Sequence, residues 1–241
     1  MTIAANLEAV QARMAEACAQ AGRNPSDVTL VAVSKTHPPA DVLEAAAAGL
    51  QHFGENRVEE SESKIPAVMA AFGSPVTWHM IGHIQSRKAK DVVALFDVVH
   101  SVDTLKLAQR LSRFAQEQGR VLDALLEVNI SGETSKSGLV AAGWETDPAL
   151  RDRLWADVGA MLALPGLQVR GLMTMAPIVE DMEHTRPIFA GLRGLRDALA
   201  RSFGVALPDL SMGMTDDYPV AIEEGATLVR IGRAIFGERI R

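Results

Sequence analysis

The chain has few of the features that mark secreted, membrane-bound or nucleic-acid-binding proteins. Cys18 is the one cysteine in 241 residues and falls in a helical apolar pattern, so we expect a core residue, no internal disulfide and a reducing compartment. The net charge of −6 argues against nucleic acid, whose phosphates are bound by clustered Lys and Arg. Residues 1–23 lack the apolar core of a signal peptide, and no apolar run approaches the roughly 18 residues of a membrane span. We therefore expect a cytoplasmic protein with neither membrane nor nucleic acid as partner.

Short apolar runs alternate with helical stretches along the chain. Strands are predicted at 28–34, 52–54, 77–81, 97–100, 122–129, 167–174, 207–211 and 227–230. Helices are predicted after them at 39–48, 57–71, 86–95, 104–118, 147–163, 184–203, 216–224 and 233–236, with one more at the N-terminus. Eight such units in series predict an α/β protein, a parallel sheet closed into a single (β/α)8 TIM-type barrel. No linker or shift in composition marks a second domain, so residues 1–241 are expected to form one domain.

Lys35 is the first candidate for chemistry, because it directly follows the strand predicted at 28–34, in the sequence VAVSKTH. Active groups of such barrels lie where strands end and loops begin. Partial burial there lowers the pKa of a lysine and allows its amine to form a Schiff base. A solvated lysine at the start of a loop is the alternative, and position alone favours it.

Two loops near the C-terminus have the composition of a phosphate site. Ser211, Gly213 and Thr215 lie between a strand and a helix, and Gly232 with Arg233 follows the last strand. Glycines let the backbone approach an anion, while hydroxyls and the N–H groups of a helix start donate to it. Phosphate sites in these barrels commonly form after strands seven and eight. Ordinary helix capping by the same serine and threonine is the alternative.

Other patterns point to weaker candidates. His79 and His83 in HMIGH lack the glutamate and the helical setting of a zinc motif, so a metal site is not expected. No serine stands in the pattern of a nucleophile elbow, which argues against a Ser-His-Asp triad. The basic run Arg87, Lys88 and Lys90 is typical of a solvated helix face. Met80 and Met175 are expected at the barrel mouth, where packing is the favoured role for both.

Seven segments together resemble a known family. They occur in order between about residues 28 and 239 and read VAVSKTHPP, FGENRVEE, WHMIGHIQSRK, VNISGETSKSG, GLMTMAP, LSMGMTDD and LVRIGRAIFGER. No single segment is specific, but the combination resembles the pyridoxal-phosphate homeostasis proteins. The resemblance implies a barrel like the N-terminal domain of alanine racemase. It also implies that pyridoxal 5′-phosphate is held as a Schiff base on Lys35.

The same resemblance assigns the remaining cofactor-binding residues. Ser211, Gly213 and Thr215 of the SMGMT segment, together with Arg230 and Gly232 of the RIG segment, correspond to the family's cofactor-binding residues. Asn56 of GENRVEE is placed near the cofactor ring, although an asparagine here also favours a turn. Arg233 departs from the family, which often has threonine there, so a hydroxyl contact to phosphate is lost.

Arg230 ends the last predicted strand and decides what chemistry a bound cofactor can do. Guanidinium has donors only, so a ring nitrogen that faces it must accept and stay unprotonated. Such a ring is a poor electron sink, which favours holding or transferring the cofactor over rapid turnover. The alternative for Arg230 is a surface salt bridge to Glu223 or Glu224.

Three functions remain in competition. The resemblance implies a protein without catalytic turnover that binds, buffers or delivers pyridoxal phosphate for vitamin B6 homeostasis, with enzymes that use this cofactor as possible recipients. A racemase-like enzyme needs a second base opposite the lysine, and the one tyrosine, Tyr218, lies near a helix start beside the expected phosphate loops. A Schiff-base aldolase without cofactor accounts for Lys35 but leaves the two loops to a phosphorylated substrate.

Overall fold

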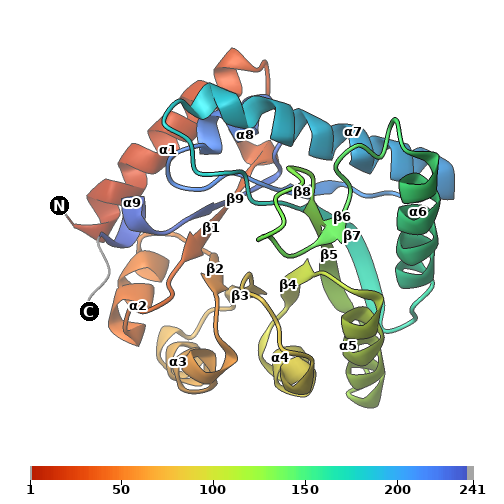
Figure 1. The fold of residues 1–241 in the computed structure, drawn as a ribbon. Helices are drawn as coiled ribbons and strands as arrows, with labels where there is room; N and C mark the ends of the chain where they lie inside the picture. The colour runs from red at the N-terminus through yellow and green to blue at the C-terminus, as the bar shows by residue number, and fades with distance from the viewer. Residues whose placement is uncertain (1, 238–241) are drawn as a thin grey trace.

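A closed parallel barrel forms the centre of the computed structural model, which describes residues 2–237 (Figure 1). Neighbouring strands in the ring follow chain order, β9 pairs with β1, and β4 pairs with β5. The predicted fold class is therefore confirmed. The barrel strands are β1 (Thr29–Val33), β2 (His52–Glu55), β3 (Thr77–Met80), β4 (Val98–Val102), β5 (Leu122–Asn129), β7 (Leu167–Met173), β8 (Asp209–Ser211) and β9 (Leu228–Ile231).

Helices cover the outside of the barrel (Figure 1). Each presents an apolar face to the strands; in α5, for example, Leu107, Leu111 and Ala115 recur every four residues and are buried. Of the helices in residues 2–237, none is both long and apolar enough to span a bilayer. The helices are α1 (Ile3–Gln20), α2 (Pro39–Ala47), α3 (Val58–Phe72), α4 (Ala89–Leu95), α5 (Leu105–Glu117), α6 (Pro148–Leu162), α7 (Arg186–Phe203), α8 (Tyr218–Glu223) and α9 (Arg233–Phe236).

The predicted boundaries differ from the observed ones for local reasons. The predicted strand 207–211 is observed only from Asp209, because Pro208 has no N–H to donate to a ladder. The predicted helices 86–95 and 184–203 each begin with a short 3-10 turn, η2 (Ser86–Lys88) and η3 (Met182–Thr185). A third such turn, η1 (Pro25–Asp27), precedes β1. The prediction missed β6 (Leu139–Val140), which pairs with the end of β5.

Helix α1 holds the C-terminal segments against the barrel. Its Asn6 donates from Nδ2 to the carbonyl oxygen of Ile235 at 2.9 Å, and Arg13 stacks over the ring of Tyr218 with 5.4 Å to the centroid. After the helix, Arg23 donates to the carbonyl oxygen of Ile222 at 2.6 Å. Segments at the start and end of the described chain are thus packed together. Glu238 and Arg239, which close the last family motif, lie outside the described residues, as does Met1.

Candidate functional site

Lys35 is the second residue after β1, on the edge of the barrel where the strands end. The side chain is half-buried. The preceding residue is tied to β2, because Ser34 N donates to the carbonyl oxygen of Gly54 at 3.0 Å and Ser34 Oγ donates to Glu55 Oε1 at 2.7 Å. The predicted position of Lys35 at the carboxyl end of a strand is therefore observed.

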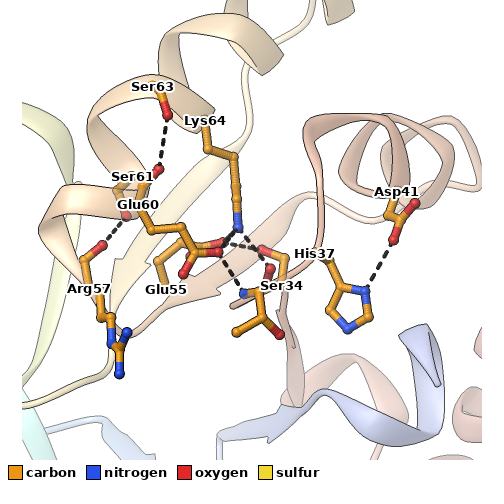
Figure 2. A network of polar contacts seen from close by, with 10 residues as sticks. Ser34, His37, Asp41, Glu55, Arg57, Glu60, Ser61, Ser63 and Lys64 are labelled. Atoms are coloured by element: carbon orange, nitrogen blue, oxygen red, sulfur yellow. Dashed lines mark hydrogen bonds and ion pairs between the residues drawn. The ribbon is translucent and has the colours of Figure 1, made fainter. Parts of the chain in front are cut away.

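A buried ion cluster fixes the turn that carries Lys35. Figure 2 shows Lys64 reaching from α3 to this turn, where its Nζ lies 2.9 Å from the carbonyl oxygen of Ser34 and 2.9 Å from Glu55 Oε1. The same Nζ donates to Glu60 Oε1 at 2.6 Å, and that oxygen also accepts the N–H of Thr36 at 2.6 Å. The residues on both sides of Lys35 are thus held by one cluster, and Lys64 is committed to structural contacts.

Two features of this cluster cost folding free energy, the backbone conformation of Thr36 and the burial of the Glu55 carboxylate, and neighbouring residues compensate both. Thr36 has φ of 66°, a left-handed conformation that costs a residue with a Cβ roughly 1–2 kcal/mol. Its hydrogen bond to Glu60 holds it there. Burial raises the pKa of Glu55, an effect that the Ser34 hydroxyl and Lys64 oppose. The sequence alone did not single out Glu55, Glu60 or Lys64 as functional.

The two C-terminal loops reach the same edge as Lys35. A Cβ built on Gly232 would lie 3.1 Å from the carbonyl oxygen of Val33, so this glycine packs directly against the end of β1. Gly213 has φ of 91°, and a Cβ there would lie 2.6 Å from Ala221 Cβ. Its carbonyl oxygen accepts the N–H of Arg230 at 3.0 Å. Gly213 therefore requires glycine, and at Gly232 a Cβ would force the end of β1 to shift by a few tenths of an ångström.

Arg230 is buried inside the barrel, which rules out the surface salt bridge considered from the sequence. Glu223 and Glu224 pair with Arg186, at 2.7 and 3.1 Å. Arg230 instead donates through Nη1 to Ser211 Oγ and through Nη2 to the carbonyl oxygen of Thr174 at 3.0 Å. Burial lowers its pKa to about 10, against the opposing effects of Asp217 and Glu127, so the guanidinium remains a cation at neutral pH.

Ser211 and Thr215 stand in different settings although they belong to one loop. Ser211 is fully buried, and its hydroxyl contacts His100 Nδ1 at 2.9 Å as well as Arg230. A phosphate cannot reach this oxygen without a rearrangement. Thr215 is half-buried at the start of the turn into α8. The turn is set by Asp217, whose Oδ1 accepts the N–H of Met214 at 2.6 Å.

Arg233, the departure from the family pattern, links the two loops. Its Nη2 lies 2.8 Å from Asp216 Oδ2, and both side chains are mostly exposed. An exposed pair of this kind contributes at most about 1 kcal/mol. Arg233 thus joins the turn before α8 to the start of α9, and much of its positive charge is balanced by Asp216.

Asn56 follows β2 and completes the set of expected site residues. Its Oδ1 is buried and has no hydrogen-bond partner among the described residues. A Cβ on Gly82 would lie 2.2 Å from the carbonyl oxygen of Asn56, so the backbone of this residue is tightly confined. Asn56 also lines a cavity of about 340 Å³ with Gly82, His83 and Arg87. Its side chain retains hydrogen-bonding capacity for a ligand.

The two histidines of HMIGH stand in different settings. His79 is buried between His52 and His100, and His83 is mostly exposed with Nδ1 3.3 Å from Asp103. Within residues 2–237, no group of three or more His, Cys, Asp and Glu side chains is placed to hold a metal ion.

Sequence reasoning missed Glu127 on β5, which is buried and near enough to Arg230 for each charge to affect the pKa of the other group. One glutamate in a strand gives no periodic signal.

Comparison with known proteins agrees with this arrangement. Residues 5–240 match the family model described as alanine racemase, N-terminal domain. The chain is 46% identical to the pyridoxal phosphate homeostasis protein of Pseudomonas aeruginosa over 238 residues, covering 99% of this chain and 96% of the relative. It is 41% identical to the protein of the same name from Aquifex aeolicus over 239 residues, covering 99% of each. The chain is thus a barrel of the alanine racemase N-terminal domain class. It belongs to the pyridoxal phosphate homeostasis protein family.

Solved structures support the same conclusion. PipY of Synechococcus elongatus PCC7942, in a structure with pyridoxal phosphate bound, superimposes with a TM-score of 0.82 at 38% identity, covering 98% of this chain and all of PipY. Alanine racemase of Clostridium difficile superimposes with a TM-score of 0.71 at 14% identity. The superposition covers 98% of this chain but only 56% of that enzyme, so the likeness concerns the barrel fold alone.

Proposed function

We propose that this protein binds pyridoxal 5′-phosphate as a Schiff base on Lys35 and buffers or delivers it, without catalytic turnover of its own. The observation that carries the proposal is the meeting of three elements on one barrel edge. Lys35 follows β1, Gly232 packs against the end of β1, and Arg230 is joined to the Ser211–Thr215 loop.

The residues present fit this cofactor. Glycines in a loop let the backbone approach an anion closely, and Gly213 and Gly232 both lie at this edge, where a Cβ would meet neighbouring atoms. The buried Oδ1 of Asn56 has no partner among the described residues. We assign the phosphate to the backbone of these two loops and to the Thr215 hydroxyl, and the ring to Asn56 and Arg230.

Arg230 sets the limit on the chemistry. When bound, pyridoxal phosphate supplies an aldehyde for covalent attachment and, in enzymes, an electron sink. A guanidinium directed at the ring nitrogen donates and cannot accept, so it keeps that nitrogen unprotonated. Because Ser211 and Thr174 already hold two of its N–H groups, Arg230 cannot move away easily. These contacts favour retention of the cofactor.

The relatives support the same reading. Several curated relatives at 38–46% identity carry the name pyridoxal phosphate homeostasis protein, and PipY has been solved with this cofactor. We further propose that residues 1–241 act as one domain in the cytoplasm, supporting vitamin B6 homeostasis. Enzymes that depend on pyridoxal phosphate are the proposed recipients.

Equilibrium dialysis against pyridoxal phosphate tests the assignment of the loops. Thr215→Ala and Ser211→Ala are each expected to weaken retention by roughly 1–3 kcal/mol at most, the usual worth of a hydrogen bond that involves a charged group. Thr215→Ala removes the hydroxyl that we assign to the phosphate, whereas Ser211→Ala removes the acceptor that holds Arg230, and the backbone donors remain in both variants. Thr146→Ala, which changes an exposed threonine before α6, is the matched control. Unchanged affinity in both loop variants would place the phosphate elsewhere.

Exchange of the Cα hydrogen of alanine or serine in heavy water, followed by NMR, separates this proposal from a racemase-like enzyme. We expect no substantial exchange, because Arg230 limits the electron sink and Tyr218 is 2% exposed beneath Arg13, where it cannot serve as a second base. Exchange at ordinary enzyme rates, roughly 1–10³ per second, would refute the non-enzyme proposal. Slow exchange that disappears in Lys35→Ala is compatible with a cofactor carrier.

A further inference from the structure

Three histidines form a continuous hydrogen-bonded chain inside the barrel. His52 Nδ1 lies 3.0 Å from His79 Nε2, and His79 Nδ1 lies 2.8 Å from His100 Nε2. His100 Nδ1 then lies 2.9 Å from Ser211 Oγ, which accepts from Arg230. The histidines come from β2, β3 and β4, whereas Ser211 is on β8, so the last contact crosses the barrel interior. The chain ends at the arginine of the proposed cofactor site.

Burial lowers the pKa of all three histidines and so favours their neutral forms. His79 and His100 are 2% and 0% exposed, and His52, which opens β2, is half-buried. Burial, with a smaller effect of His52, lowers the pKa of His79 to about 3. Burial, His79 and Arg230 together lower the pKa of His100 well below its usual range. Each ring therefore carries one proton, on either Nδ1 or Nε2.

Neutral rings in this arrangement must all carry their proton on the same nitrogen, either Nδ1 in all three or Nε2 in all three. His79 and His100 each use both nitrogens within the chain, so a ring that donates from Nε2 must accept at Nδ1. If His100 accepts at Nδ1, it donates from Nε2 to His79, and His79 in turn donates from Nε2 to His52. If His100 donates from Nδ1, every bond reverses. One choice at Ser211 therefore decides the position of three protons.

The contacts of the Ser211 hydroxyl determine which nitrogen carries the proton. Arg230 can only donate, so the Ser211 oxygen is its acceptor. The hydroxyl proton then needs an acceptor of its own, and the other contact that the structure gives this oxygen is His100 Nδ1. A buried hydroxyl that left its proton unused would lose roughly 1–3 kcal/mol. Ser211 consequently donates to His100, and all three rings are protonated at Nε2.

We propose that His100, supported by His79 and His52, is a positioning residue of the cofactor site: it holds the Ser211 proton, and so fixes the Ser211 oxygen as the acceptor that orients Arg230. The proposal rests on the proposed function, in which Arg230 faces the cofactor ring. It also assigns Ser211 a role through Arg230 in place of a direct contact with phosphate. In this proposal the guanidinium of Arg230 is oriented by Ser211 and His100, neither of which contacts the ligand.

Nitrogen-15 NMR of the cofactor-free protein tests the proton positions directly. With labelled histidine, and each ring assigned by single His→Gln substitution, we expect His52, His79 and His100 all to show Nε2–H at neutral pH. Ser211→Ala removes the proton that fixes the order, so both forms should then appear in His100. A wild-type His100 that carries its proton on Nδ1, or on both nitrogens, would overturn the proposal. A purely packing role predicts no change in tautomer in Ser211→Ala.

Affinity for pyridoxal phosphate, measured by equilibrium dialysis, tests the positioning. His100→Leu should weaken binding about tenfold or more, whereas His100→Asn, whose Oδ1 takes the place of Nδ1, should stay within about threefold of wild type. His184→Leu, which changes an exposed histidine in η3, is the control. Equal affinity in wild type and a folded His100→Leu would refute the proposal, and so would an equal loss in His100→Asn and His100→Leu.

The two proposals fail in distinguishable ways. If the wild-type protein does not bind pyridoxal phosphate, the proposed function falls, while the tautomers of the cofactor-free protein still decide whether Ser211 donates to His100. Addition of the cofactor supplies a further check. If all three histidines change to Nδ1–H on binding, Ser211 has turned its proton to the phosphate, and the positioning proposal is wrong. Unchanged tautomers support it.

Discussion

The Lys35→Ala variant is expected to show no visible absorption band after incubation with pyridoxal phosphate, whereas the wild-type protein shows one. The reason is that, in the proposed function, the amine of Lys35 supplies the nitrogen of the covalent bond, and its position after β1 places it on the same edge as the two loops to which we assign the phosphate. Borohydride reduction and peptide mapping should label Lys35 in the wild-type protein. Phosphate contacts remain in the variant, so dialysis should still detect weak, non-covalent binding.

Lys106→Ala is the control for this experiment, since Lys106 is an exposed lysine on α5. It should leave both the absorption band and the label unchanged. Circular dichroism should show that Lys35→Ala retains its fold, because the side chain is only half-buried in a turn. A reduced label on Lys64 or Lys136 in the wild-type protein would contradict the assignment of Lys35.

Lys64→Met is expected to lower the free energy of unfolding by about 3–5 kcal/mol at neutral pH, the usual cost of removing one partner of a buried ion pair. Lys64 and Glu55 are 4% and 0% exposed, with Nζ and Oε1 2.9 Å apart. Without the lysine, Glu55 keeps its charge in an apolar setting or takes up a proton. Denaturant titration measures the loss, and adding Glu55→Gln to the variant should recover part of it. The control is Lys88→Met, because Lys88 forms three partly exposed ion pairs and should lose at most about 1 kcal/mol.

The loss in Lys64→Met should depend on pH in a definite direction. Burial raises the pKa of Glu55 in the folded protein, and removal of Lys64 raises it further. The folded variant then binds a proton more tightly than the unfolded chain, so it is relatively more stable below the ordinary carboxyl pKa of about 4.3 and loses stability as the pH rises. The difference from wild type should therefore be largest at pH 7–8 and shrink toward pH 5. A difference that does not vary with pH would show that Glu55 is not the group left uncompensated.

The barrel was predictable because each strand and helix is encoded locally. Strand β5 has the same bounds in prediction and structure, since Leu122–Asn129 is a long apolar run that follows Gly119. The errors fall where a single interaction outweighs the pattern, as at Pro208, or where a strand is too short to have a period, as with Leu139–Val140. Closure between β1 and β9 followed from the number of units and not from any one residue.

The site was predictable only in part, since its recognisable motifs cover the loops but not their support. The positions of Lys35, Gly213 and Gly232 follow from motif and strand order. The resemblance alone implied their ligand, and the comparisons support that ligand for relatives. The burial of Arg230 was left open, because a sequence does not show which way the side chain of a strand residue points. The chain from His52 through His79 and His100 ends in a contact between His100 and Ser211 that spans 111 positions, too far apart for any local pattern to reveal.

The packing of α1 on the last segments has a consequence for synthesis of the protein. Asn6 contacts Ile235 across a separation of 229 residues, and β1 pairs with β9 on one side of the same junction. A nascent chain therefore cannot close its barrel, or bring Gly232 to the end of β1, until Leu228–Phe236 has emerged from the ribosome. Up to that moment the two C-terminal loops, to which we assign the phosphate, are not in place beside Lys35, so the proposed site is incomplete during translation. Any stabilisation by the ligand begins only once this part of the chain is complete.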